Sequence, residues 1–142
     1  MRFVLDNSVA MRWLLNDRPS EVQDYARSIL QMLADGDTAV VPQLWSLEAA
    51  NVLAKSMKRG LVNEADIREF LALLSDLDIE TAPTTQERAL YDTLRIAIQH
   101  DLSAYDAAYL ELALREGLPL ATLDLDLSAA VGKAGGRCVL NK

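Results

Sequence analysis

Short apolar segments that alternate with helical segments are the feature that most constrains the fold of this chain. Residues 2–5 form a short apolar run that ends at Asp6, and apolar residues then recur at helical spacing. Further short apolar runs follow at 38–41, 78–81 and 120–122, each after a helical segment. Parallel strands need long crossover connections and are buried on both faces. The alternation therefore predicts an α/β domain of three layers, with a central parallel sheet between helices.

Capping and turn residues mark the expected helix ends. The expected helices cover residues 21–34, 44–59, 63–75, 84–99, 103–116 and 127–134, and residues 137–140 are expected to be extended. Ser20 with Gln23 and Thr84 with Glu87 have the form of capping boxes, and Asn63 and Ser103 are expected N-caps. The two successive helices between 44 and 75 predict a helical hairpin packed on the same domain. With 142 residues and no linker, residues 1–142 are expected to form a single domain.

The composition excludes several classes of protein. One cysteine, Cys138, and one histidine, His100, cannot form an internal disulfide or a zinc cluster. We expect Cys138 to be a small buried residue and His100 to complement the dipole at a helix end. The chain start has no long apolar region, and no segment approaches the roughly 18 uncharged apolar residues of a membrane-spanning helix. The expected location is the cytoplasm, without a membrane partner.

Acidic residues stand where a parallel sheet gathers its loops. Asp6 follows the first strand, Asp124 and Asp126 follow the strand at 120–122, and Glu48 and Asp106 lie at helix starts among apolar residues. Each acid alone has a structural explanation as a turn, cap or first-turn helix residue. Together, at the carboxyl ends of the strands, they would repel one another unless a cation lay between them. Carboxylates without thiolates select Mg²⁺ or Mn²⁺, which predicts a phosphodiester hydrolase that uses metal-activated water.

Two other classes of α/β protein place acids at strand ends. A receiver-type signalling domain requires an aspartate after its third strand, where this chain has Thr81 to Pro83. A phosphatase of the haloacid dehalogenase type requires a DxD motif after the first strand, where this chain has Asp6, Asn7 and Ser8. A catalytically silent binding module is disfavoured because all four separated acids are present.

Three long segments resemble the PIN-domain ribonucleases, and more closely the VapC-type toxins of toxin–antitoxin pairs. They are FVLDNSVAMRWLL, VVPQLWSLEAANVLAKSMKRG and HDLSAYDAAYLELALREGLPLATLDLDL, in that order, and the resemblance covers nearly the whole chain. It implies a PIN-like fold, Mg²⁺-dependent endoribonuclease activity, a homodimer and inhibition by a VapB-type antitoxin.

The resemblance also implies roles for individual residues. Asp6, Glu48, Asp106 and Asp124 match the four family acids, with Asp6, Asp106 and Asp124 as metal ligands. Glu48 and Asp126 reach the metal through water in this interpretation, and the sequence leaves open whether Asp126 shares or replaces the role of Asp124.

Three further positions match supporting residues of the family. Ser8 and Thr122 match hydroxyl positions near the site. Asn51 lies one helical turn after Glu48 and is expected to hold that glutamate by a hydrogen bond.

The charge distribution limits how RNA would be bound. A net charge of -7 excludes broad electrostatic coating by RNA and leaves recognition that is local and centred on the metal. The candidate phosphate-binding residues are Arg12, Lys55, Lys58 and Arg59; a solvated helix end is the alternative for the last three.

The aromatic residues and the biological role leave alternatives open. We expect Trp13, Trp45, Tyr105 and Tyr109 to pack in the protein rather than stack on RNA, with the alternative for Tyr105, which adjoins Asp106, that it faces the groove. The sequence does not encode whether transfer, ribosomal or messenger RNA would be cut. A housekeeping RNA-processing nuclease is the alternative to a toxin, and an adjacent antitoxin reading frame would distinguish the two.

Overall fold

The computed structural model describes residues 1–140, in which four parallel strands form one sheet. The strands are β1 (Arg2–Leu5), β2 (Thr38–Pro42), β3 (Ile79–Ala82) and β4 (Leu120–Ala121), in the order β3-β2-β1-β4. Phe3, Val4 and Leu5 of β1 are all fully buried, as expected for a central strand that is covered on both faces. The predicted parallel sheet is confirmed.

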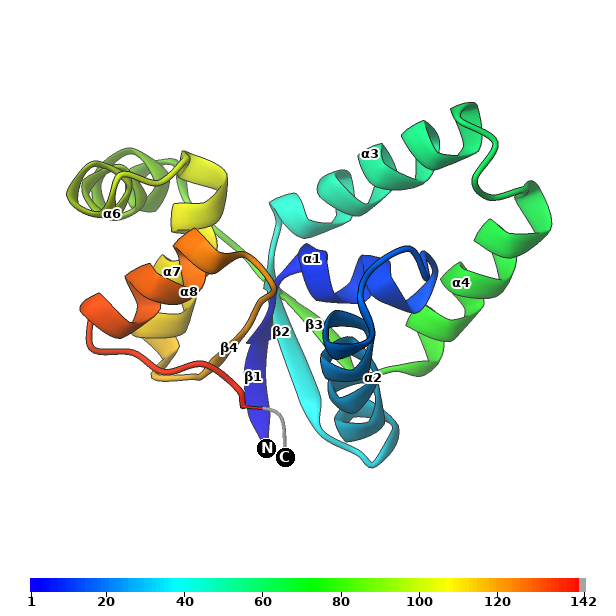
Figure 1. Cartoon of the computed structure of the whole chain (residues 1–142). Helices are drawn as coiled ribbons and strands as arrows, with labels where there is room; N and C mark the ends of the chain where they lie inside the picture. Colours follow the sequence, from blue (N-terminus) through cyan, green and yellow to red (C-terminus); the bar gives the residue numbers. More distant parts are fainter. Residues whose placement is uncertain (141–142) are drawn as a thin grey trace.

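Helices cover both faces of this sheet. Figure 1 shows α7 and α8 on one side and α1 and α2 on the other, which confirms the three-layer α/β/α architecture. The helical elements are α1 (Asn7–Ala10), the 3₁₀ turn η1 (Met11–Trp13), α2 (Ser20–Ala34), α3 (Leu44–Lys58), α4 (Glu64–Asp76), α5 (Gln86–Arg88), the π-helical turn η2 (Ala89–Thr93), α6 (Leu94–His100), α7 (Ala104–Glu116) and α8 (Leu125–Lys133). Within residues 1–140, no helix is both long and apolar enough to span a bilayer.

The expected pair of helices between residues 44 and 75 is present as α3 and α4. The two helices diverge from their connecting loop as an open V (Figure 1). α1 packs against α3, and Trp13 and Leu14 line a hollow together with Phe70 and Leu73 of α4. The V therefore encloses the segment that follows β1.

Two helix starts differ from the sequence prediction. The expected capping box of Ser20 and Gln23 is wrong, because Pro19 is the N-cap of α2 and Gln23 is buried. The Gln23 side chain donates instead to the carbonyl oxygen of Arg12, 3.2 Å away. Among residues 1–140 a capping box is formed instead by Asn63 and Asp66 at the start of α4, where the sequence predicted only an N-cap.

The segment after β3 also differs in detail. Thr85, not Thr84, caps the helix by accepting a hydrogen bond from the backbone of Arg88. The single helix expected over residues 84–99 consists of α5, the π turn η2 and α6 in succession. Near the C-terminal end, the extended segment pairs with β4 through a bridge between Leu120 and Cys138.

The order of the strands places a crevice at one end of the sheet. From β1 the chain moves to β2 and β3 on one side, and it returns to β4 on the other side of β1. Leu5 is paired with Ala121, and the backbone N–H of Asp6 donates to the carbonyl oxygen of Ala121 at 2.9 Å. Ligand sites in open parallel sheets form where the strand order reverses, at the carboxyl ends of the strands. The residues that follow β1 and β4 meet at this point.

Candidate active site

Asp6 is held at the crevice by two hydroxyl groups. The hydroxyls of Ser8 and Thr122 both donate to Oδ2 of Asp6, each at 2.7 Å. Ser8 Oγ in turn accepts from the backbone N–H of Leu123, and Thr122 Oγ1 accepts from that of Asp124. These bonds tie the end of β1 to the end of β4 and give the buried Asp6 carboxylate one orientation. The supporting positions expected for Ser8 and Thr122 are thus in contact with the first acid.

Glu48 is held by a tyrosine from another helix. Glu48 lies near the start of α3 and is half-buried, and the Tyr109 hydroxyl donates to its Oε1 at 2.5 Å. Tyr109 is fully buried on α7, three residues after Asp106. Residues at this spacing lie on the same side of a helix. α7 therefore presents both a carboxylate and the group that orients Glu48 to the crevice.

Asp106 and Asp124 both lie at helix N-termini; the sequence predicted a first-turn position for Asp106 and a turn or cap position after the strand for Asp124. Ser103 caps α7 and accepts from the backbone N–H of Asp106, which places this acid in the first helical turn. Asp124 is itself the N-cap of α8, because its Oδ1 accepts from the backbone N–H of Leu127 at 2.9 Å. Asp126 lies in the first turn of α8 and is exposed. Asp106 in the first turn of α7 and Asp124 as the N-cap of α8 therefore lie close enough for their charges to interact at the crevice.

The pKa values of Asp6, Glu48 and Asp106 are raised, in part by the charges of neighbouring acids. Burial is the largest cause of the raised pKa values of Asp6, Glu48 and Asp106. The negative charge of Asp124 adds to the rise for Asp6 and Asp106, and the charge of Asp6 adds to it for Glu48 and Asp106. For the Asp106 pKa, Asp126 is the smallest of these causes. Acids from four separate elements thus interact in one place, where a cation would relieve their repulsion.

The oxygen atoms at this place fit a hydrated Mg²⁺ ion. Within residues 1–140, no three acidic, histidine or cysteine side chains are gathered tightly enough to enclose a metal by themselves. Mg²⁺ keeps several waters and takes about one or two protein carboxylates, so spaced carboxylates suit it better than a closed cage. Asn7 Oδ1 is buried beside Asp6 without a hydrogen-bond partner in the described chain, and Asn7 lines a hollow with Ser8 and Asp124. This unpaired acceptor is a further oxygen that suits a cation with its water shell.

Comparison with known proteins places this chain in a family. The family model described as "PIN domain" matches residues 3–133. The chain belongs to the PIN-domain family. It is similar to ribonuclease VapC3 of Pyrobaculum aerophilum, with 31% identity over 128 residues that cover 90% of this chain and 93% of that protein. The resemblance seen in the sequence is confirmed.

Solved structures show the same PIN fold. The crystal structure of PAE2754 from Pyrobaculum aerophilum superposes with a TM-score of 0.64 at 22% identity, covering 92% of this chain and 84% of that chain. VapBC2 from Rickettsia felis, bound to a DNA fragment from their promoter, superposes with a TM-score of 0.63 at 14% identity. That match covers 99% of this chain and 98% of the other.

Two residues expected near the PIN-domain site do not take their expected roles. Asn51 is exposed on α3, and in the described chain Glu48 is bonded to Tyr109 rather than to Asn51, because Glu48 turns toward α7. The Arg12 guanidinium is paired with Asp17, and 11% of its side chain is exposed, so its charge is not free at the surface. Arg18, which the sequence reading did not select, is exposed and lines the same hollow as Asp124. The sequence feature that could have identified Arg18 is its position directly before Pro19, which predicts a loop.

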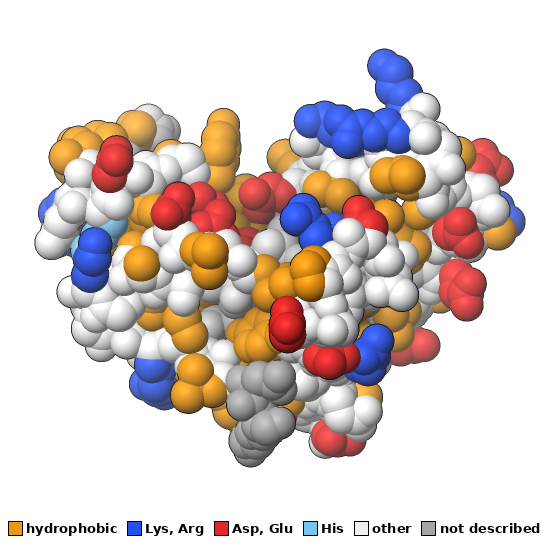
Figure 2. Space-filling model, in the orientation of Figure 1, with side chains coloured by type: hydrophobic (Ala, Val, Ile, Leu, Met, Phe, Trp, Pro, Cys, Tyr) orange, Lys and Arg blue, Asp and Glu red, His pale blue; other side chains and the backbone are white. Residues whose placement is uncertain are grey.

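The basic residues of α3 form a separate surface. Figure 2 shows Asp and Glu side chains on the walls of a notch between the α7–α8 side and the α3 side, and Lys and Arg side chains along the outer surface of α3. Lys55, Lys58 and Arg59 are exposed there and form no ion pair with any described residue. At 1.5 Å rise per residue, Lys55 lies roughly 10 Å along the helix from Glu48. Lys58 and Arg59 lie a turn farther along, so these free charges all lie on one side of Glu48 along α3.

Proposed function

We propose that this PIN-domain protein is a metal-dependent endoribonuclease that acts as the toxin of a VapBC-type toxin–antitoxin pair in the cytoplasm. The observation that carries the proposal is the convergence of Asp6, Glu48, Asp106 and Asp124 at the point where the strand order reverses. The similarity to a VapC ribonuclease along nearly the whole length of both chains supports the same activity.

The chain's own residues suit the binding of Mg²⁺, for which Mn²⁺ is a substitute. In the proposal, Asp6, Asp106 and Asp124 hold the ion, and Glu48 and Asp126 contact it through water. When bound, Mg²⁺ lowers the pKa of water and neutralises charge at a phosphate. Ser8 and Thr122 keep the Asp6 carboxylate in one rotamer, so that little reorganisation accompanies metal binding.

In the proposal, Glu48 accepts a proton. Its Oε1 is occupied by the Tyr109 hydroxyl, which leaves Oε2 to take a proton from the attacking water. Burial and the neighbouring acids raise the Glu48 pKa, and a general base works best when its pKa approaches the operating pH. Lys55, Lys58 and Arg59 bind the flanking phosphates and keep the RNA in the notch.

The proposal is tested by incubating the purified protein with total RNA and, separately, with single-stranded DNA, which an endoribonuclease should leave uncut. We expect endonucleolytic cleavage of RNA in Mg²⁺ or Mn²⁺, no cleavage in excess EDTA, and recovery when Mg²⁺ is restored. Cleavage that persists in EDTA would contradict the metal mechanism. The absence of RNA cleavage under all metal conditions would contradict the nuclease function.

Charge reversal on α3 tests RNA binding. Lys58→Glu with Arg59→Glu should weaken RNA binding by about tenfold or more, because two phosphate contacts are lost. For the same reason, the slope of the log binding constant against the log salt concentration should become shallower by roughly 1 to 2. Fluorescence anisotropy over a series of salt concentrations measures both quantities. Arg27→Glu with Arg68→Glu is the matched control, since it makes the same change in net charge on α2 and α4. Equal effects of the two double variants would show that only net charge matters.

The proposed partners are a VapB-type antitoxin and a second copy of the chain. The net charge of -7 and the acidic notch favour a basic antitoxin segment. A row of exposed apolar side chains on η2 and α6 suits a homodimer contact; Leu90, Leu94 and Ile98 are 56%, 48% and 74% exposed. An adjacent antitoxin reading frame whose product stops cleavage distinguishes the toxin from a housekeeping PIN-domain nuclease.

A further inference from the structure

We propose that a cavity beside the acids binds one nucleobase of the RNA and thereby sets the cleavage sequence. This proposal rests on the proposed ribonuclease function. The cavity has a volume of about 320 Å³ and lies between the start of α3, α7, η2 and the loop after β3. Pocket volumes for bound small molecules run from about 300 to 1,000 Å³, so this cavity suits one planar ring system.

The cavity lies directly next to the acids. Leu44 lines it and precedes Glu48 by one turn of α3, and Tyr105 lines it and precedes Tyr109 by one turn of α7. Residues four apart lie on one face of a helix, about one turn or 5.4 Å along the axis. Since Tyr109 is bonded to Glu48, both helices lead from the cavity to the same carboxylate in a single turn. A base in the cavity therefore belongs to a nucleotide adjacent to the bond held at the acids.

Tyr105 provides a stacking surface at the edge of the cavity. Its side chain is 65% exposed, whereas Tyr109 on the same helix is fully buried. Unpaired RNA bases are typically bound by stacking on exposed aromatic rings. The packing role expected for Tyr105 is wrong, because its side chain is exposed at the edge of the cavity one residue before Asp106 on α7.

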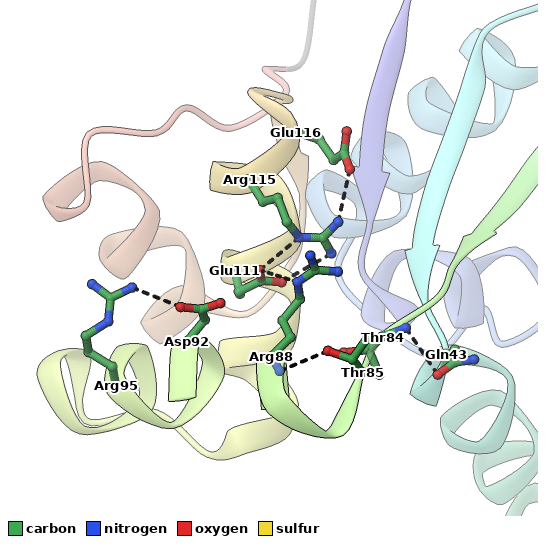
Figure 3. A network of polar contacts seen from close by, with 9 residues as sticks. All are labelled: Gln43, Thr84, Thr85, Arg88, Asp92, Arg95, Glu111, Arg115 and Glu116. Atoms are coloured by element: carbon green, nitrogen blue, oxygen red, sulfur yellow. Dashed lines mark hydrogen bonds and ion pairs between the residues drawn. The ribbon is translucent and has the colours of Figure 1, made fainter. Parts of the chain in front are cut away.

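The remaining walls suit an uncharged base better than a phosphate. Figure 3 shows Glu111 between Arg88 and Arg115; Nε of Arg115 lies 2.9 Å and Nε of Arg88 lies 3.6 Å from Glu111 Oε1. Arg115 is also paired with Glu116. Both arginine charges are thus compensated by acids, and they offer no free positive charge to a phosphate.

Gln43 provides a polar group for a base edge. Its Oε1 accepts from the backbone N–H of Thr84 at 3.3 Å (Figure 3), and its amide NH₂ group has no partner in the described residues. Apart from Gln43, Thr84, Thr93 and the charged pair, the lining is mainly apolar, including Pro42, Ala82, Ala108 and Leu112. An apolar slot with an aromatic edge and one free amide matches the chemistry of a nucleobase.

Sequencing the cut ends of a randomised single-stranded RNA pool tests the proposal. We expect the wild-type protein to prefer one or two bases at a position next to the cut, and Tyr105→Ala to reduce that preference by about tenfold, within the range of a lost base stack. Ala108→Leu, which fills the cavity and keeps the Tyr105 ring, should have the same effect. Tyr105→Phe keeps the ring and should retain the preference. Gln43→Ala, which removes the free amide, should also reduce the preference, and Gln86→Ala, at an exposed glutamine outside the cavity, is its control.

The outcomes separate this proposal from the nuclease function. No cutting by the wild-type protein would contradict the nuclease function itself. Cutting without any flanking preference, or a preference that Tyr105→Ala and Ala108→Leu both leave unchanged, would overturn the base-binding cavity. A lower sedimentation mass for Tyr105→Ala with an unchanged preference would show that a second copy of the chain fills the cavity, which also overturns it.

An activity-independent measurement uses RNA that contains 2-aminopurine at the preferred position, bound to the Asp6→Asn protein. Stacking on Tyr105 should quench its fluorescence, and the additional change Tyr105→Ala should remove the quenching. Quenching that is identical with and without the Tyr105 ring would contradict the proposal.

Discussion

Replacing Asp6 by Asn is expected to abolish RNA cleavage while leaving the fold intact. The Asn side chain can still accept from the Ser8 and Thr122 hydroxyls, so the link between β1 and β4 survives. The charge that would hold the metal is lost, and a metal ion contributes several kcal/mol of transition-state stabilisation, so the cleavage rate should fall by about 10³-fold or more. Single-turnover cleavage of a defined RNA measures the rate, and circular dichroism measures the fold.

The same variant should be more stable than the wild type without metal. Burial raises the pKa of Asp6 above its ordinary value, so the folded protein binds this proton more tightly than the unfolded chain does. The stability that this group contributes is present below its unfolded pKa of 3.8 and is lost as the pH rises through its higher folded pKa. In EDTA, the free energy of unfolding of Asp6→Asn should therefore exceed that of the wild type by a margin that grows as the pH rises, to on the order of 1 kcal/mol.

Added Mg²⁺ should reverse this order of stability. A ligand at 100 times its Kd stabilises the folded state by about 2.7 kcal/mol. Mg²⁺ should therefore raise the free energy of unfolding of the wild type far more than that of Asp6→Asn. Urea unfolding at several pH values, with EDTA or Mg²⁺, measures these differences, and Asp24→Asn on α2 is a control distant in sequence from the site acids. Wild-type cleavage by Asp6→Asn, or an equal stabilisation of both proteins by Mg²⁺, would contradict the role given to Asp6.

Replacing Tyr109 by Phe should lower the cleavage rate by about 10- to 100-fold, because a misplacement near 1 Å costs about that factor. Phe fills the same space but leaves Glu48 Oε1 without its donor. Tyr109 is fully buried and does not touch RNA, so kcat should fall while KM changes little. The lost hydrogen bond should cost about 1 to 3 kcal/mol of folding free energy.

Tyr25→Phe is the matched control for this experiment. The Tyr25 hydroxyl donates to the carbonyl oxygen of Val139 at 2.8 Å rather than to an acid, and burial raises its pKa to about 12. Tyr25→Phe should also lower the free energy of unfolding, but it should leave kcat unchanged. Equal kcat values for Tyr109→Phe and the wild type would show that the tyrosine does not position Glu48.

The sequence predicted most elements because their signals are local. The strands at Arg2–Leu5 and Thr38–Pro42 are short apolar runs, and Gly117 ends α7 with φ of 66°, a conformation that favours glycine. The capping box predicted at Ser20 is wrong because α2 has Pro19 as its N-cap and the buried Gln23 side chain turns to the carbonyl oxygen of Arg12. The π turn within 84–99 has no comparably simple local signal.

Some residues of the candidate site could also be predicted from the sequence, and others could not. The acids could be found from their positions after strands and at helix starts, and Ser8 and Thr122 from the resemblance to PIN-domain proteins. The partner of Glu48 could not, because the choice between Asn51 and Tyr109 depends on how α3 faces α7. Likewise, the pairing of Arg12 with Asp17 and the exposure of Tyr105 depend on how the elements pack together.

By itself, the sequence determined that this chain is a parallel α/β domain with four separated acids at strand and helix ends, since hydrophobic period and capping are properties of neighbouring residues. Only the tertiary structure decided that β4 lies beside β1, which brings Thr122 and Asp124 to Asp6. Only it decided that Tyr109 orients Glu48 and that a cavity lies one helical turn away. These contacts join residues up to 116 positions apart. Their geometry is set by the packing of whole elements, which no local pattern encodes.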